Sequence, residues 1–357
     1  MPIAMKFSLF TEVQCPPGST PLERLNELLE QARLADELGY YGLWIAEIHF
    51  QQPFSLLSAP YPVLGAISQT TRRLRLGVAV NLLSVHHPLH LAEEAAMLDL
   101  LSHGRVDFAL GRGHPHTRVF EGFEVDPGRI RSLMEESLKV ILAAWTQERL
   151  EFEGEFYKIP EIAVSPKPLQ RPHPPVYTAN SSLDGVEFTA RLGLNLLLPI
   201  HTLNREQVRN LATAYWELLE KHGHDRSRRE LGLLTPVHLA ETTDKAREQA
   251  RDGFMDYYRV IRETRQNYQT WLASRGVDAS QRLRPAPWEG MTFERMCAEH
   301  AIIGDSNMAA EEIRRLSQET GATHFLSWMN MGSIPHRLVL DSMQRYTRDV
   351  IARLDSP

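Results

Sequence analysis

The sequence predicts an α/β protein folded as a single (βα)8 TIM barrel, and three observations favour this fold. About eight strand-like apolar segments alternate with helical segments along the 357 residues. Apolar runs of this kind, separated by helices, are typical of a parallel sheet buried on both faces. No shift in composition marks a second domain, so we expect one domain over residues 1–357. A doubly wound sheet is the alternative, but no GxGxxG motif follows the first strand and no GxxxxGKS/T motif occurs.

Composition and charge narrow the class of protein further. Hydrophobic residues make up 43% of the chain, and 39 basic against 45 acidic residues give a net charge of -6, without the basic excess typical of proteins that bind nucleic acid or anionic membranes. The two cysteines, Cys15 and Cys297, form no CxxC pattern, so neither a disulfide framework nor a zinc site is indicated. Without a signal peptide or an apolar run of membrane-spanning length, we expect a cytoplasmic protein.

The eight predicted strands are short apolar runs bounded by glycine, proline or polar turns. They cover residues 6–10, 42–46, 74–83, 106–110, 176–179, 194–199, 231–239 and 324–328. Between them lie helices with clear start signals. Thr20, Pro21 and Glu23 form a capping box with proline at the first helical position, and Asn204 with Gln207 caps a later helix. Residues 160–175 are rich in proline, and we expect a surface crossing there.

Residues 244–303, between the seventh and eighth predicted strands, are too long for an ordinary barrel connection. They are helical but irregular in pattern and contain the stretch RPAPWEGM. Connections of this length inside a compact domain are usually functional. We therefore expect an inserted lid over about residues 244–303.

Arg112 follows the predicted central strand at residues 106–110 and is flanked by Gly111 and Gly113. A strand buried on both faces exposes charge at its end, and parallel α/β folds bind ligands at the carboxyl end of their strands. Flanking glycines allow close approach of a backbone, and a guanidinium suits a phosphate. An ordinary solvated arginine in a turn is an equally good explanation.

Two further positions suggest an anion site, each with a plain alternative. Arg129 and Arg131 fall at the start of a predicted helix, where cations oppose the helix dipole unless an anion lies nearby; a pair of solvated arginines is the alternative. The turn at Asn180, Ser181 and Ser182 precedes another helix, whose first N–H groups suit a phosphate. Simple helix capping is the commoner explanation for such residues.

Several segments, in order, resemble the bacterial luciferase-like, flavin-dependent monooxygenases, a (βα)8 family. They are GLWIAEIHF (42–50), LRLGVAVNLLSVHHP (74–88), LAEEAAMLDLLSHGRVDFALGRG (91–113), RVFEGFEVDPGRIRSLMEE, PVYTANSS and TGATHFLSWMNMGS. The resemblance covers almost the whole chain. It implies that Arg112, Arg131 and the turn Asn180, Ser181 and Ser182 hold the phosphate of FMN.

The resemblance also implies cofactor contacts from Ala79, Asn81 and Ala179, and a non-proline cis peptide near Ala79–Val80 in the third strand. At the turn, the luciferases have an acidic residue followed by serine, whereas this chain has Asn180 and Ser181. The missing carboxylate should not weaken an anion site.

One departure from the family concerns proton chemistry. The luciferase pattern after the second strand is Glu-His-His-Phe, and its first histidine is catalytic; this chain has Glu47-Ile48-His49-Phe50. Because Ile48 cannot move a proton, that work falls to His49, to His114 or His116 in the following loop, or to the flavin peroxide itself. The alternative for His49 is a packed histidine that ties Glu47 to the backbone. The departure makes light emission with a long-chain aldehyde doubtful.

The function implied is a monooxygenase that uses FMNH2 and O2 to oxygenate a small organic substrate through a flavin hydroperoxide. Because no nicotinamide motif is present, a separate flavin reductase would supply FMNH2. A deazaflavin-dependent hydride-transfer enzyme and a catalytically silent flavin-binding subunit are the alternatives. We expect a homodimer, since the family commonly pairs through helices beside the early strands and residues 91–101 are unusually apolar. We expect no metal, because the histidines lack a ligand spacing.

Overall fold

The computed structural model describes residues 5–113, 118–281, 283, 286 and 288–354, and it confirms the (βα)8 barrel. Each barrel strand pairs in parallel with the next, and the last strand pairs with the first, so the sheet closes. In order around the barrel, the strands are β1 (Lys6–Thr11), β2 (Gly42–Ile45), β3 (Arg75–Leu82), β4 (Val106–Gly111), β7 (Val176–Ala179), β8 (Asn195–Pro199), β9 (Leu231–Leu239) and β11 (His324–Trp328).

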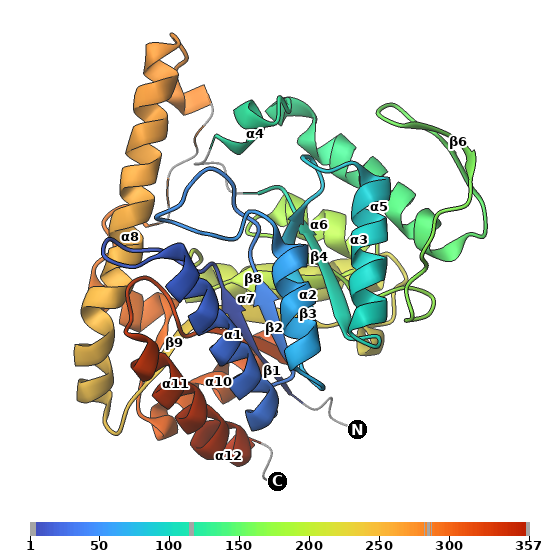
Figure 1. The fold of residues 1–357 in the computed structure, drawn as a ribbon. Coiled ribbons are helices and arrows are strands. Elements are labelled where there is room, and N and C mark those ends of the chain that lie inside the picture. The colour runs from blue at the N-terminus through green and yellow to red at the C-terminus, as the bar shows by residue number, and fades with distance from the viewer. Residues whose placement is uncertain (1–4, 114–117, 282, 284–285, 287, 355–357) are drawn as a thin grey trace.

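Helices follow the strands and cover the outside of the barrel (Figure 1). They are α1 (Pro21–Leu38), α2 (Pro60–Thr70), α3 (Pro88–Leu101), α4 (Val119–Gly122), α5 (Ile130–Thr146), α6 (Leu183–Arg191), α7 (Arg205–Lys221), α8 (Thr243–Ser274), α9 (Phe293–Arg295), α10 (Ser306–Thr320), α11 (His336–Arg345) and α12 (Ala352–Leu354). Both predicted capping boxes are present: Thr20 and Glu23 at α1, and Asn204 and Gln207 at α7.

The structure differs from the sequence prediction in three elements. β5 (Leu150–Glu153) and β6 (Lys158–Ile162) form an antiparallel hairpin that was not predicted, largely before the expected surface crossing at residues 160–175. A short strand, β10 (Ile302–Gly304), pairs with β9 beside the barrel. The predicted irregular insertion begins instead as one 32-residue helix, α8, which stands along one side of the barrel and extends past it in Figure 1.

The distal part of α8 contacts the α4 segment. Tyr268 donates a hydrogen bond to Glu121 Oε1 at 2.5 Å, and the Arg118 guanidinium lies 5.7 Å from the centre of the Trp271 ring. The insertion therefore reaches the loops that follow β4, although its action as a lid stays a prediction.

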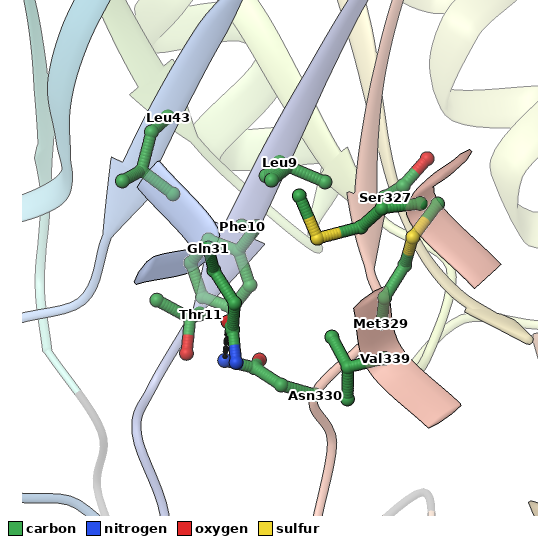
Figure 2. A pocket seen from close by; sticks show the side chains of 10 residues that line it. Leu9, Phe10, Thr11, Gln31, Leu43, Ser327, Met329, Asn330 and Val339 are labelled. Atoms are coloured by element: carbon green, nitrogen blue, oxygen red, sulfur yellow. Dashed lines mark hydrogen bonds between the residues drawn. The ribbon is translucent and has the colours of Figure 1, made fainter. Parts of the chain in front are cut away.

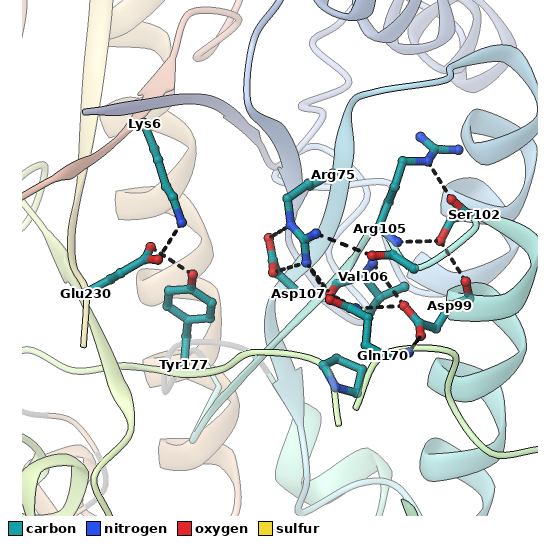
Figure 3. Close-up of polar contacts among 12 residues, drawn as sticks. Lys6, Arg75, Asp99, Ser102, Arg105, Val106, Asp107, Gln170, Tyr177 and Glu230 are labelled. Carbon is teal, nitrogen blue, oxygen red and sulfur yellow. Dashed lines mark hydrogen bonds and ion pairs between the residues drawn. The ribbon is translucent and has the colours of Figure 1, made fainter. Parts of the chain in front are cut away.

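Charged and polar side chains close the amino end of the barrel (Figure 3). Lys6, at the start of β1, pairs with Glu230, which also accepts a hydrogen bond from Tyr177 Oη at 3.0 Å. Arg75, at the start of β3, binds Asp107 of β4 through Nε at 2.9 Å and Nη2 at 2.6 Å. With this end filled by paired groups, a ligand has to approach the opposite, carboxyl end of the strands.

The barrel interior is packed and is not a pore. The Trp44 indole lies over Gly77, where an added Cβ would come within 2.3 Å of Trp44 Cε3, and it meets Tyr177 edge-on at 5.2 Å. Nearer the carboxyl end, Trp328 packs edge-on against Phe10 at 5.3 Å. Among the described residues, no helix combines the length and the apolar character needed to cross a membrane.

Candidate active site at the carboxyl ends of the strands

The predicted cofactor residues lie at neighbouring strand ends. Asn81 pairs with Leu110 between β3 and β4, and Leu110 pairs with Thr178 between β4 and β7. Arg112 and Asn180 each lie two residues beyond that pairing, so the ends of β3, β4 and β7 bring them to one edge. Carboxyl-end loops of this kind carry the active sites of (βα)8 enzymes.

The end of β3 is irregular where the sequence suggested it. The Ala79–Val80 peptide is cis, which confirms that expectation, and the pairing register with β4 shifts between Val78 and Asn81. The buried Asn81 side chain donates to Ala109 O at 2.8 Å and accepts from Tyr61 Oη at 3.0 Å. Asn81 therefore fixes the strand end with both of its polar atoms, while Ala79 is only partly buried.

The turn after β7 combines capping with a group of helix-start amides. Asn180 Nδ2 donates to Thr178 Oγ1 at 2.9 Å and to Thr189 Oγ1 at 3.0 Å, and Ser182 caps α6 by accepting from Gly185 N. Ser182 is thus the helix cap, whereas the Asn180 side chain ties the turn to Thr178 and Thr189. Ser181 is exposed, and the first amides of α6 point out of the helix, as they do at every helix start.

The three predicted arginines differ in their surroundings. Arg129 pairs with Glu155 of the hairpin turn at 2.5 Å and stacks on Phe156 at 4.4 Å. Arg131 is exposed in the first turn of α5, which contains no acidic residue, and none of the described residues forms an ion pair with it. Arg112 is exposed directly after β4. Arg131 therefore suits an anion better than Arg129 does, and Arg112 lies at the end of a buried strand, where the sequence predicts an anion site.

His49 belongs to a buried histidine–carboxylate cluster. Glu47 Oε1 accepts a hydrogen bond from His49 Nε2 at 2.8 Å and another from His86 Nε2 at 2.6 Å, while Glu47 Oε2 accepts from Leu82 N at 2.9 Å. The Glu47 side chain is completely buried, and His49 is nearly so. The cluster joins the end of β2 to the end of β3 and the loop that follows it.

The protonation of the cluster follows from these contacts. Burial alone would raise the pKa of Glu47, but hydrogen bonds from His49, His86 and Leu82 N, with the charge of His86, lower it. Burial opposes charge on His86, yet hydrogen bonding to Glu47 and the negative charges of Glu47 and Glu94 raise the His86 pKa. These contacts favour the carboxylate form of Glu47 and the protonated form of His86.

Aromatic rings border the cluster on its outer side. The His49 ring lies edge-on to Phe123 at 4.9 Å, and Phe123 lies 5.3 Å from Phe50. Phe50 has a positive φ of 62°, and its ring fills the space that a side chain at Gly122 would need. Ile48 is buried in the core. His114 and His116 lie outside the described residues.

Two buried carboxyl groups at this end of the barrel, Glu47 and Glu12, were not identified as site residues from the sequence, nor was the histidine that pairs with Glu47. Glu47 was treated only as a possible partner of His49, and His86 was not singled out, although it precedes His87 in the HHP sequence after β3. Glu12, just after β1, is also buried; burial raises its pKa well above the usual range, and Gln14 Nε2 donates to it at 3.0 Å. Acidic residues directly after barrel strands were the available signal.

The Glu47, His49 and His86 atoms lie within 4.8 Å of one another, the only such group among the described residues with a spacing that a metal could use. Their O···N distances are those of hydrogen bonds, and we assign them so. The expectation of a metal-free protein stays a prediction. A separate cavity between β1, β11 and α11, lined by Thr11, Gln31 and Asn330 among others, holds about one water and is too small for a cofactor (Figure 2).

A closed (βα)8 barrel with arginines and a histidine–carboxylate cluster at its carboxyl edge has the architecture of a barrel enzyme. Residues 5–324 match the luciferase-like monooxygenase family, and the chain belongs to this family. Its members include enzymes named as monooxygenases, which places the protein among the oxidoreductases.

Characterised relatives are similar over most of the chain. The oxygenase component of a flavin-dependent trigonelline monooxygenase from Acinetobacter baylyi is 29% identical over 71% of this chain and 71% of its own. The alkanal monooxygenase alpha chain of Photorhabdus laumondii is 28% identical over 71% of this chain and 70% of its own.

Solved structures share the fold. The monooxygenase RslO1 from Streptomyces bottropensis superposes with a TM-score of 0.83 at 23% identity, covering 98% of this chain and 99% of that one. The oxygenating constituent of 3,6-diketocamphane monooxygenase from Pseudomonas putida, in complex with FMN, gives 0.79 at 18% identity, with 98% and 99% covered. An F420-dependent secondary alcohol dehydrogenase gives 0.76 at 16% identity, with 98% and 99% covered.

Proposed function

We propose that this protein is an FMNH2-dependent monooxygenase that inserts one atom of O2 into a small organic substrate. The observation that carries the proposal is the alignment of the ends of β3, β4 and β7, which are followed by Arg112 and by the turn that starts α6. We propose that Arg131, in the first turn of α5, completes this site. Bound there, reduced flavin supplies the electrons that activate O2.

The residues present fit a flavin phosphate. Arg112 and Arg131 provide two positive charges, and the α6 start provides Ser181, Ser182 and backbone N–H donors. No acidic residue in the first turn of α5 neutralises Arg131. Ala79, at the cis peptide near the end of β3, and Ala179, the last residue of β7, have small side chains that would leave room for a ring system.

The chain's own residues would control access and protons. The α4 segment and the distal part of α8, joined through Tyr268 and Glu121, would exclude water from the bound cofactor. His49 would hold or release a proton beside it, since its side chain is anchored to Glu47 at the carboxyl edge. His114 and His116 remain further proposals for that role.

The reductant would come from a separate flavin reductase. The A. baylyi relative is named as an oxygenase component, which suggests the same division of labour here. We also propose a homodimer and a cytoplasmic location.

A deazaflavin-dependent hydride transfer is the second candidate, favoured by the likeness to the F420-dependent dehydrogenase. Anaerobic titration with reduced FMN and with reduced F420, followed by addition of 18O2 and candidate substrates, separates the two. We expect tight binding of reduced FMN and 18O in the product. Hydride transfer from F420 without oxygen consumption would overturn the proposal. Turnover by the purified homo-oligomer would exclude a catalytically silent subunit.

A further inference from the structure

One carboxylate oxygen of Glu47 accepts hydrogen bonds from both imidazole rings of the cluster. Glu47 Oε1 lies 2.8 Å from His49 Nε2 and 2.6 Å from His86 Nε2, and the other oxygen is held by Leu82 N. An ionised carboxylate only accepts hydrogen bonds, so both Nε2 atoms have to carry hydrogen. In its neutral form, His49 therefore has its lone pair on Nδ1.

The two histidines are not equivalent. The His86 side chain is 25% exposed on the loop after β3, whereas His49 is 9% exposed. The charged groups that act on His86 are Glu47 from the end of β2 and Glu94 from α3, and both favour its protonated form. Protonated His86 would therefore offset the negative charge of Glu47.

Nδ1 of His49 has no hydrogen-bond partner in the part of the chain that the structure describes. Its ring position is fixed from two sides, by the bond to Glu47 and by the edge-on contact with Phe123. A histidine anchored in this way presents one defined nitrogen to a ligand, because the bond made by the other nitrogen selects the tautomer.

We propose that His86 is a positioning residue: through Glu47 it holds His49 in the Nε2–H tautomer, so that Nδ1 is the atom that takes up and returns a proton at the bound ligand. His86 itself does not touch the ligand. The inference rests on the proposed function only for the identity of that ligand. The tautomer and the charge arrangement are properties of the unliganded protein.

The first test is the tautomer of His49 in protein labelled with 15N at the histidine rings. Long-range 1H–15N correlation distinguishes Nε2–H, Nδ1–H and doubly protonated rings, and His49→Gln identifies the His49 signals. We expect the Nε2–H form in the wild type above neutral pH and a mixture of tautomers in Glu47→Gln. An Nδ1–H ring in the wild type, or an unchanged tautomer in Glu47→Gln, would overturn the proposal whether or not the protein turns over FMNH2.

The second test is the pH profile of product formed per reduced FMN. His86→Asn keeps a donor for Glu47 but removes the positive charge, so the acid limb should move up by about one pH unit. His222→Ala, which changes an exposed histidine at the end of α7, should leave the profile in place. A His86→Asn profile identical to that of the wild type, in protein whose circular dichroism is unchanged, would contradict the positioning role. A complete lack of turnover in the wild type would reject the proposed function alone, since the tautomer result stands by itself.

Discussion

At the scale of single residues, His49 distinguishes an enzyme that directs oxygen chemistry from one that only holds a flavin. His49→Ala removes the imidazole while leaving Arg112, Arg131 and the α6 start intact. We expect FMN affinity to be unchanged and product per reduced FMN to fall by roughly 10² to 10⁴, the usual contribution of an acid–base group. Hydrogen peroxide should rise correspondingly. The assay measures product and peroxide together, with His222→Ala as the control.

A different result would assign His49 a structural role. If His49→Ala lowers stability but its folded fraction couples oxygen normally, the histidine serves to hold Glu47, and proton transfer belongs to His114 or His116.

Glu230 gives a residue-scale prediction about stability. Burial opposes its ionisation, but the His324 ring, 3.7 Å away, and the ion pair with Lys6 lower the Glu230 pKa to about 2. A carboxylate whose pKa is lowered on folding stabilises the native state above its unfolded pKa, about 4.3 in peptides, and this contribution is lost as pH falls toward about 2. When the pH falls from 6 to 3, the free energy of unfolding of the wild type should decrease by about 2 kcal/mol more than that of Glu230→Gln.

Urea unfolding of both proteins at the two pH values provides the measurement. At pH 6, Glu230→Gln should already be less stable, since it lacks the ion pair with Lys6. An equal loss of stability in both proteins on acidification would show that Glu230 is not a source of the acid sensitivity.

Local sequence pattern located residues at strand ends better than it predicted the hydrogen bonds between side chains. Arg112 could be placed at a strand end from its flanking glycines and the apolar run before it. The hydrogen bond between His86 and Glu47 could not be predicted from local pattern. It joins side chains 39 positions apart in the sequence, which the pairing of β2 with β3 brings together. Likewise, Arg129 and Arg131 have the same local pattern, and only the β5–β6 hairpin, which supplies Glu155, separates them.

At the scale of elements, the packing of α8 depends on two glycines. Gly332, in the loop after β11, has a φ of 68°, and a Cβ there would come within 1.9 Å of Gly253 O in α8. Ser333 N donates to the same carbonyl at 3.2 Å. Gly332→Ala should therefore lower the free energy of unfolding by at least about 2 kcal/mol, from backbone strain and the displacement of α8.

Gly276, just after α8, is the matched control. Its φ is 71°, but nothing lies within 4 Å of an added Cβ, so Gly276→Ala should cost only about 1 kcal/mol. Denaturant unfolding compares the two variants. Equal effects would mean that the contact between Gly332 and Gly253 does not hold α8 in place.

The hydrophobic periodicity of the sequence predicted strands and helices correctly where the local pattern agreed with the burial of the segment in the fold. The bounds of β9 and β11 match the predicted strands, because continuous apolar runs are what a strand buried on both faces requires. The regularity of α8 was not predicted, although its buried residues recur at helical spacing, among them Phe254, Ile261 and Leu272. Glycine, threonine, arginine and tyrosine at the other buried positions interrupt the apolar stripe. The β5–β6 hairpin depends on a distant contact, since Glu136 of α5 accepts three backbone N–H groups of its turn.

At the scale of the whole molecule, we predict a homodimer that buries the outer face of α3. Met97, Leu100 and Leu101 are 49%, 38% and 48% exposed there, which is unusual for large apolar side chains grouped on one helix. Light scattering at micromolar concentration should give about twice the chain mass of 40.8 kDa. Replacing Met97 and Leu101 with glutamate should produce monomers. A wild-type mass near that of one chain would rule out the dimer.

The central claim is that this barrel holds the phosphate of FMN at the edge shared by Arg112, Arg131 and the α6 start. The most direct measurement compares the affinities of FMN and of riboflavin, which lacks the phosphate, for the wild type, Arg112→Ala and Arg129→Ala by anaerobic titration of the reduced flavins. We predict that the wild type prefers FMN, and that Arg112→Ala weakens FMN binding by roughly 1.5 to 3 kcal/mol while hardly changing riboflavin binding. Arg129→Ala should behave as the wild type, because Arg129 is paired with Glu155. Equal affinities for FMN and riboflavin in the wild type, or an FMN preference that survives Arg112→Ala, would contradict the account.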